Sequence, residues 1–487
     1  MIAPYFVIIP LVTAFLIVLF GRKAEKIAGY LSLFATTILM WLSVLLFPII
    51  NIQGAIVYQL SDWKIPYTIS LVIDHLSAFI MITISLIALL SIIYSINYAR
   101  KFTSNWGYYA LFMLLLAGLN GVAITGDLFN LFVFMEIALI ATYALVAFQG
   151  KAEHYEASFK YAIMGSISST LILFGIGCAY SMTSSLTMMQ ISIKSSSTAG
   201  LYLLSALFLA GFGLKSAMFP LHSWLPDAHP SAPSPVSAML SGVLIKVLGA
   251  YAIIRIFYMV LEPSKLVNEV LLLFGTLSMV VGAIMAIAQK DIKRMLGFSS
   301  VSQMGYILLG IGLATPLGFL GAIYHILNHA VLKSLLFLDS GAIEEMEGTR
   351  NLEKMQGNTD LITKTSTYMG ALGISGVPPF GGFFSKLIII VAAISSGRYI
   401  YAIIGLIVGV LTLGYYLAML KKAFKEKKES KKIGISLKIS LVILACLTLA
   451  TALLFIPGLR EGFLNKVVDC ITDREAYAAL FKVGAGL

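Results

Sequence analysis

The chain has 487 residues and a mass of 52.8 kDa, with 59% hydrophobic residues and only 12% charged residues. Soluble proteins carry about 25% charged residues, and a mean hydropathy of +0.93 exceeds what soluble cores can bury, so a soluble multidomain protein is excluded. The net charge of +11 would suit nucleic-acid binding only if the basic residues cluster on one surface. The three cysteines form no CxxC pair, and they cannot by themselves ligate an iron–sulfur cluster or zinc.

Apolar segments of about 20 residues, the length that crosses a bilayer, recur along the whole chain. They predict an all-α polytopic membrane protein with about fourteen transmembrane helices. These are expected at residues 2–20, 27–47, 73–97, 108–125, 128–149, 158–182, 200–220, 236–258, 267–288, 298–314, 318–340, 366–396, 399–420 and 436–457. The first is not expected to be a cleaved signal peptide, because its basic residues follow the apolar stretch rather than precede it.

Lysine and arginine gather in alternate loops between these segments. Loops after odd-numbered helices hold twenty, whereas loops after even-numbered helices hold only Lys64, Lys194, Lys265 and Arg398. The positive-inside rule therefore predicts a multi-pass protein of the cell membrane with basic loops in the cytoplasm and both termini outside. This distribution explains the net charge without nucleic acid. The run KKAFKEKKESKK at 421–432 is interpreted as a solvated loop, with anionic lipid or a partner protein as the alternative ligand.

A few ionisable residues remain inside the predicted spans. Each costs about 2.5–3.5 kcal/mol at mid-helix, which makes it a candidate functional group. They are Glu136, Lys215, Lys246, His325, His329, Lys333 and Lys386. Arg255 and Lys438 lie near span ends, where their side chains are expected to snorkel to the interface.

Glu136 and Lys246 are both expected near the middle of the membrane. Glu136 lies nine residues after Asp127, or about 13.5 Å of helix, and Lys246 lies ten residues into its predicted helix. A purely structural ion pair between Glu136 and a lysine is the alternative. Permanent buried pairs seldom add net stability, which favours a functional role.

Lys215 and Lys386 lie beside prolines that are expected to break helices 7 and 12. Lys215 either snorkels from a helix that ends at Pro220 or sits at the break of a protein-covered, re-entrant segment. Five prolines between 220 and 235 favour the second interpretation. Lys386 follows the sequence GVPPFGG (376–382), which interrupts a helix, frees carbonyl groups and makes room for water beside the lysine.

His325, His329 and Lys333 follow one another at intervals of four residues. On a helix they lie within about 80° of one another and climb about 12 Å, so they form one polar stripe. A zinc site is not expected, because HILNH lacks the glutamate of HExxH and no third ligand is evident. A proton-conducting stripe is the favoured interpretation, with a packing role as the alternative.

The two predicted breaks indicate an internal repeat, a common feature of secondary transporters. The two lysines are 171 residues apart, an offset that places helices 4–8 and 9–13 in corresponding positions. An odd number of helices in each unit would invert the second unit relative to the first. The predicted parts are 1–104 (three N-terminal helices), 105–260 (first five-helix repeat), 265–422 (second five-helix repeat) and 423–487 (basic loop, helix 14 and tail).

Five segments that carry these residues resemble a known family. They are GDLFNLFVFMEIALIATYALVAF, GFGLKSAMFPLHSWLPDAHPSAPSPVSAMLSGVLIKVLGAY, KDIKRMLGFSSVSQMGYI, NHAVLKSLLFLDSG and GVPPFGGFFSK. They resemble the antiporter-like subunits of respiratory complex I, Mrp cation/proton antiporters and membrane-bound hydrogenases, over roughly residues 70–420. Within that family the chain looks most like the D-type Mrp protein and its counterpart in archaeal hydrogenase or sulfur-reducing complexes.

The resemblance implies a role for each buried group. It implies that Glu136 and Lys215 form a coupling ion pair, that Lys246 is a central lysine, and that Lys386 is the terminal lysine. The histidines and Lys333 would connect these lysines. Some relatives carry glutamate in place of Lys386, and Asp339 departs from the pattern without an assigned role.

The resemblance also implies a proton-translocating subunit with no cofactor and no metal. Its expected partners are other membrane subunits in lateral contact, lipid, protons and possibly sodium. No redox chemistry is expected of this chain itself. The identity of any electron donor, and whether sodium moves, stay open.

Two other functions stay open at this point. A stand-alone transporter for a small organic substrate would need a sizeable binding cavity, whereas the buried groups suit a relay of single protons. A quinone-reactive redox subunit would need no cluster or haem ligands, and the sequence offers none.

Overall fold

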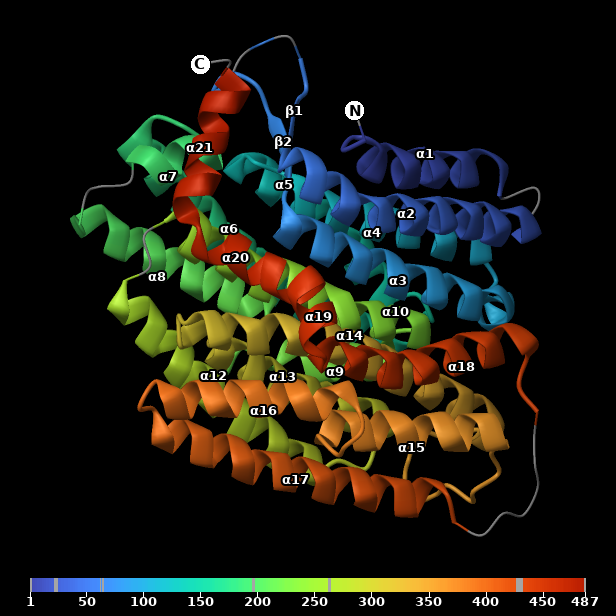
Figure 1. Cartoon of the computed structure of the whole chain (residues 1–487). Coiled ribbons are helices and arrows are strands. Elements are labelled where there is room, and N and C mark those ends of the chain that lie inside the picture. Colours follow the sequence, from blue (N-terminus) through green and yellow to red (C-terminus); the bar gives the residue numbers. More distant parts are fainter. Residues whose placement is uncertain are drawn as a thin grey trace.

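The computed structural model is a bundle of long helices that lie side by side (Figure 1). It describes residues 2–21, 25–61, 63, 65–194, 198–261, 264–425 and 432–485. The helices are α1 (Tyr5–Phe20), α2 (Glu25–Gln53), α3 (His75–Tyr98), α4 (Asn105–Ile124), α5 (Leu128–Val146), α6 (Ala152–Thr183), α7 (Met188–Lys194), α8 (Thr198–Lys215), α9 (Trp224–Ser231), α10 (Ser234–Met239), α11 (Ala252–Ile254), α12 (Lys265–Ile287), α13 (Ile292–Gly312), α14 (Pro316–Glu347), α15 (Leu361–Ser375), α16 (Gly381–Ser395), α17 (Tyr399–Ala423), α18 (Ile435–Ala450), α19 (Pro457–Arg460), α20 (Lys466–Thr472) and α21 (Arg474–Ala485). One antiparallel hairpin, β1 (Ile56–Gln59) and β2 (Ser70–Ile73), joins α2 to α3.

Eleven helical segments of the described chain are long and apolar enough to cross a membrane. Three shorter apolar helices cover Tyr5–Phe20, Gly200–Lys215 and Gly381–Ser395. Large apolar side chains such as Phe15, Trp41, Phe159 and Phe174 are exposed on the outside of the bundle, as expected of a surface that faces lipid. The predicted all-α integral membrane fold is confirmed, whereas the exact number of crossings remains a prediction.

Three segments are wholly enclosed by the others: Ser234–Val260, α13 and α14. The first is irregular, with π-helical turns at Leu240–Leu244, Lys246–Tyr251 and Arg255–Val260. Such turns widen a helix locally and are frequent at functional sites. These enclosed segments form the centre of the bundle, where lipid cannot reach.

Both predicted helix breaks are present. The helix α8 ends at Lys215 and helical structure resumes at Trp224, while α15 ends at Ser375 and α16 begins at Gly381. At the first break, Trp224 Nε1 donates a hydrogen bond of 3.1 Å to the Leu214 carbonyl, which satisfies one of the freed backbone groups. At the second, Gly376 adopts φ +86°, a left-handed conformation that favours glycine and ends the helix.

A short backbone pairing occurs twice in the described chain. Asp127 caps α5 and pairs with Thr187, and Asp291 caps α13 and pairs with Asn351. Each member of the second pair follows its counterpart by 164 residues, close to the 171 residues between the two lysines at the breaks. This recurrence supports an internal repeat; the five-helix units and their inversion remain predictions.

The two ends of the bundle differ in charge. The helices α1, α3 and α17 end on the right of Figure 1, at what we call the basic end, because the connections there carry most of the described loop lysines and arginines. Arg22, Lys23, Lys64 and part of the basic run, 426–431, lie outside the described residues. The cellular side of this end remains a prediction.

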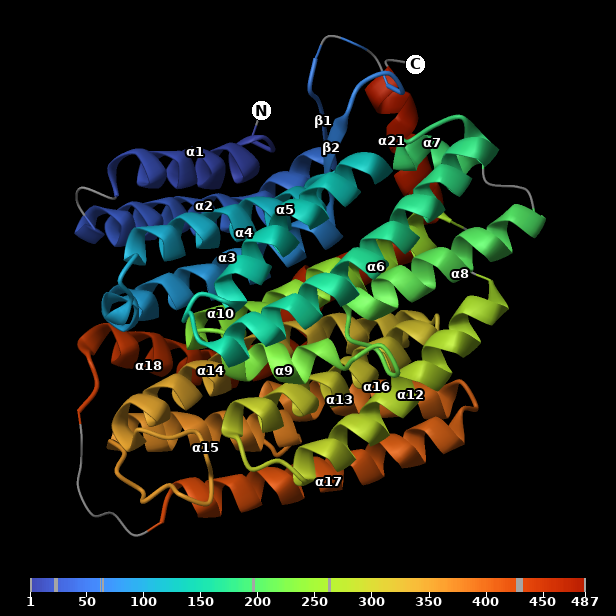
Figure 2. The ribbon, with the colours of Figure 1, turned by 180° about the vertical axis from the view of Figure 1, so that it is seen from behind.

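The C-terminal elements cross one face of the bundle diagonally, from α18 at the basic end to α21 at the other end (Figure 1). On the way, α18 and α20 pack on α3 and α14, and α21 packs on α7. Figure 2 shows the opposite face, with α6, α8 and α12 in view. The C-terminal elements therefore cover part of the enclosed helix α14.

Candidate functional site

Glu136 of α5 and Lys215 of α8 meet through a serine. Lys215 Nζ lies 3.9 Å from Glu136 Oε1. The same ammonium donates to Ser169 Oγ at 2.8 Å, and that hydroxyl donates to Glu136 Oε1. Lys215 also donates to the Gly165 carbonyl at 3.2 Å. The direct ion pair is therefore loose, and Ser169 of α6 completes it.

The two charged partners differ in exposure. The Lys215 side chain is 2% exposed, whereas the Glu136 side chain is 29% exposed. The lysine is enclosed by protein, and the carboxylate opens onto the outer face of α5. A neighbouring molecule in the membrane can therefore reach Glu136 without entering the bundle.

Lys246 lies at the centre of the enclosed segment and is fully buried. Its ammonium donates to the Ser241 carbonyl five residues earlier, within the π-helical stretch. Ser241 Oγ in turn lies 2.7 Å from Ser300 Oγ of α13. In the described part of the chain no carboxylate forms an ion pair with Lys246, so only backbone and hydroxyl dipoles surround it.

His325, His329 and Lys333 lie on α14 as one buried stripe. His325 Nδ1 lies 2.9 Å from Ser385 Oγ of α16, and its Nε2 lies 3.2 Å from Gln303 Oε1 of α13. Lys333 donates to the Leu296 carbonyl at 2.9 Å and to a tyrosine hydroxyl of α17 at 3.1 Å. The stripe thus touches α13, α16 and α17.

His329 lies between its two neighbours on the stripe. Its ring centroid is 6.1 Å from that of His325, and neither ring nitrogen finds a hydrogen-bond partner among the described residues. A buried imidazole left without partners is costly, and a water molecule can supply them. His329 is therefore the position in the stripe that is best suited to hold water.

Lys386 lies just after the second break. Its ammonium donates to the Ile374 carbonyl at 2.6 Å and lies 4.9 Å from the centroid of the Tyr306 ring. A cavity of about 230 Å³ adjoins it, lined in part by Gly405 and Gly409 of α17. The carbonyl acceptor and the space for water are those that the proline–glycine sequence predicted.

His229 of α9 is a buried group that the sequence analysis missed. Its ring stacks on Phe337 of α14 at 4.2 Å, and both ring nitrogens lack partners among the residues described. The charges that act on it belong to Lys246, Lys293 and Lys333. A histidine inside a proline-broken apolar stretch was the available signal.

The prediction that Arg255 snorkels to the interface is wrong. Its side chain is 3% exposed and forms two contacts with the Asp74 carboxylate, Nη1 to Oδ2 at 2.5 Å and Nη2 to Oδ1 at 2.8 Å. Tyr477 of α21 lies over the guanidinium, 5.2 Å from its carbon. Arg255 is buried because α3 supplies a counter-charge and the C-terminal helix covers the pair. Lys438, by contrast, stays 29% exposed and lies 3.4 Å from Asp360.

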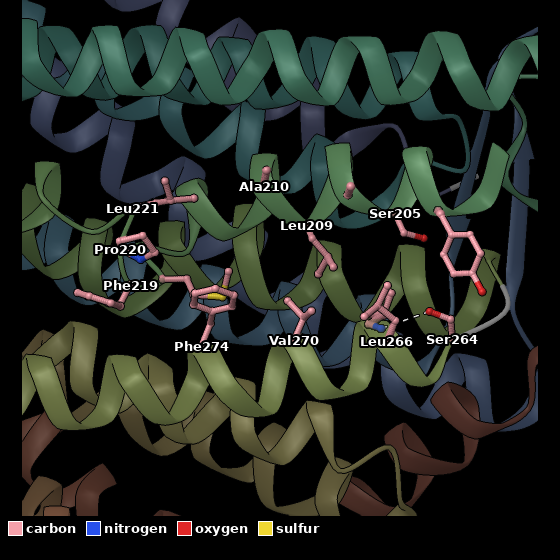
Figure 3. Close-up of a pocket in the computed structure, with 14 residues that line it drawn as sticks. Ser205, Leu209, Ala210, Phe219, Pro220, Leu221, Ser264, Leu266, Val270 and Phe274 are labelled. Carbon is pink, nitrogen blue, oxygen red and sulfur yellow. Dashed lines mark hydrogen bonds between the residues drawn. The ribbon is translucent and has the colours of Figure 1, made fainter. Parts of the chain in front are cut away.

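A larger cavity of about 400 Å³ lies between α8 and α12. Figure 3 shows Phe219, Pro220 and Leu221 of the first break at one end, and Ser205 and Ser264 toward the other. The lining is almost wholly apolar, and it includes none of the predicted site residues. Sites for small polar molecules need several convergent polar groups, so this cavity does not support the organic-substrate transporter.

Comparisons with known proteins agree on one family. Residues 125–412 match the family model described as NADH:quinone oxidoreductase/Mrp antiporter, TM. The chain is 32% identical to the D-type protein of the Na(+)/H(+) antiporter of Alkalihalophilus pseudofirmus, over 97% of each chain. It is 37% identical to the N-type protein of the NADH-quinone oxidoreductase of Desulforudis audaxviator, over 75% of each.

Among solved structures, the chain superposes on one from the membrane-bound sulfane sulfur reductase, an archaeal respiratory membrane complex. The TM-score is 0.92 and the identity 29%, covering 98% of this chain and 99% of that one. The family match contains every predicted site residue from Glu136 to Lys386. The chain is an integral membrane protein that belongs to the NADH:quinone oxidoreductase/Mrp antiporter family.

Proposed function

We propose that this chain is the proton-translocating subunit of a multisubunit membrane complex. Its protons move through a relay of seven buried or half-buried groups. These are Glu136, Lys215, Lys246, His325, His329, Lys333 and Lys386. The relatives named as antiporter and oxidoreductase subunits support this assignment.

The observation that carries the proposal is how the enclosed lysines are held. Lys246, Lys333 and Lys386 donate to backbone carbonyls or hydroxyls, and no carboxylate ion pair holds them in the described part of the chain. A lysine held only by dipoles loses and regains a proton without breaking an ion pair. This suits a relay better than it suits a structural brace.

Lys215 is the member whose proton affinity can be switched. A nearby carboxylate favours the charged form of a lysine, and burial favours the neutral form. Bringing Glu136 closer therefore holds the proton on Lys215, and separating them releases it inward. Moving one charge against 100 mV costs about 2.3 kcal/mol, which a change of about two pKa units supplies.

The partner acts on this switch from the side. The half-open face of Glu136 lets a charge on a neighbouring membrane subunit attract or repel the carboxylate. Energy then comes from that subunit, either from redox chemistry in a hydrogenase- or sulfur-reductase-type complex or from a sodium gradient in an Mrp-type complex. The basic end faces the cytoplasm under the positive-inside rule.

The test compares the complex with the isolated chain. The native complex is purified through a tag on this chain, its subunits are identified, and both preparations are placed in sealed vesicles with a pH-sensitive dye. We expect proton transport driven by the complex and none that is energised in the single chain. Robust stoichiometric exchange by the single polypeptide would overturn the proposal in favour of a stand-alone transporter.

A further inference from the structure

Asp339 of α14 is a buried carboxyl that the relay above does not use. It is fully enclosed, and its Oδ1 accepts a hydrogen bond of 2.6 Å from Ser366 Oγ of α15. Its Oδ2 has no hydrogen-bond partner in the described structure, and no described lysine, arginine or histidine forms an ion pair with it. Burying an ionised carboxylate without a counter-charge is very costly, so Asp339 holds a proton in this arrangement.

A line of polar groups leads from Asp339 along one face of α15. Asp360 caps this helix and accepts a hydrogen bond from the Thr363 amide at 2.9 Å. Thr363 and Ser366 follow at successive intervals of three residues, which places them on the same side of the helix. Beside Asp360 stands Lys438 of α18, 3.4 Å away and partly exposed.

This line begins at the basic end of the bundle. The helices α15 and α18 lie against each other, and both begin on the right of Figure 1. From Asp360 to Ser366 the line rises about 9 Å into the bundle. It therefore runs from the basic surface to an enclosed carboxyl.

Three polar atoms on this line have no hydrogen-bond partner among the described residues: Asp339 Oδ2, Thr363 Oγ1 and Asp360 Oδ2. The last of them has only the looser contact with the Lys438 ammonium. Each such atom costs about 1–3 kcal/mol if nothing satisfies it. Buried polar groups in proteins are satisfied by ordered water when no side chain serves. Three such atoms in a row indicate a file of water molecules, not isolated packing faults.

We propose that Asp360, Thr363, Ser366 and Asp339 line a hydrated branch through which protons enter the relay from the basic end. The branch rests on the proposed function, since it supplies protons to Lys333. Asp339 lies six residues beyond Lys333 on α14, about 9 Å along the helix axis, and a short chain of water spans this gap. Asp339 gives its proton toward Lys333 and regains one from the file that leads to Asp360.

The first test measures water access without measuring transport. In the complex with Cys178, Cys446 and Cys470 changed to serine, Thr363→Cys is treated with a small membrane-impermeant thiol reagent on either side of sealed vesicles. Ser340→Cys is the control, because Ser340 is equally enclosed but its hydroxyl donates to the Phe337 carbonyl of its own helix. We expect Thr363→Cys to react from the basic end only and Ser340→Cys to stay unmodified. Equal protection of both thiols would overturn the branch.

The second test measures proton delivery. Asp339→Asn keeps the shape and the hydrogen bond from Ser366 but cannot exchange a proton, so transport by the assembled complex should fall about tenfold or more. Asp339→Glu should retain part of the activity, and Ser340→Ala should match wild type. If Asp339→Asn fails to assemble, Thr363→Val provides the same test from the other end of the branch.

The outcomes separate this inference from the proposed function. Normal transport by Asp339→Asn, with transport lost in a Glu136 variant, rejects the branch alone. Thiol access at position 363 with normal transport in the Glu136 variant keeps the water file but rejects the relay that it is meant to supply.

Discussion

The two broken helices place a lysine in two different settings. Lys215, where α8 ends, reaches a carboxylate through Ser169 and is shut off from the surface. Lys386, just after the second break, donates to a backbone carbonyl and adjoins a cavity of about 230 Å³. Both breaks leave lysine near freed backbone, but only the first adds an acid.

This difference suggests a division of labour along the relay. A carboxylate within about 4 Å changes the proton affinity of its lysine whenever it moves, so the first break acts as the switch. Water beside the second lysine carries protons away without a partner acid, so the second break acts as the exit. The following predictions test that contrast, from the largest expected effect to the smallest.

Removing the acid should have the largest effect. Glu136→Ala should abolish transport by the assembled complex in sealed vesicles, a loss of about a hundredfold or more, because Lys215 no longer has a partner that switches it. Glu136→Asp, with a shorter side chain, should retain part of the activity. Assembly is checked by subunit composition, and normal transport with alanine would leave Glu136 only a packing role.

Changing the charge chemistry at the second break comes next. Lys386→Met should block transport, and Lys386→Arg should retain little, because arginine keeps the positive charge but does not release its proton. Initial rates of dye-reported proton movement compare both variants with wild type. Full activity with arginine would make Lys386 an electrostatic fixture, and the contrast between the two breaks would lose its functional meaning.

Weakening the bridge should have an intermediate effect. Ser169→Ala removes the hydroxyl between Glu136 and Lys215 and should slow transport by up to about tenfold, the equivalent of one hydrogen bond. Thr170→Ala is the matched control, because the Thr170 hydroxyl donates to the Ser166 carbonyl of its own helix. Equal rates in both variants would show that the direct 3.9 Å pair works without the serine.

Breaking the ion pair at the end of the enclosed segment should affect transport least. Arg255→Met leaves Asp74 buried without its counter-charge, which should cost about 3–5 kcal/mol of stability. Thermal unfolding of the purified complex measures that loss. Below the lowered melting temperature, transport per assembled complex should stay close to wild type. A strong transport defect at full stability would place Arg255 in the relay.

The sequence by itself determined the fold class and the two breaks. Apolar segments of membrane length and prolines in helices act locally, since each constrains only the backbone around it. For the same reason the stripe of His325, His329 and Lys333 could be predicted, because residues four apart on one helix must share a face. These features need no knowledge of neighbouring helices.

Only the tertiary structure decided which buried groups meet. Ser169, His229 and Asp339 look ordinary in an apolar sequence, and their importance comes from partners on other helices or from the lack of any partner. Arg255 shows the same limit, because its burial depends on Asp74, 181 residues earlier. Side-chain electrostatics acts through space over a few ångströms, and the packing of distant segments decides which charges come that close.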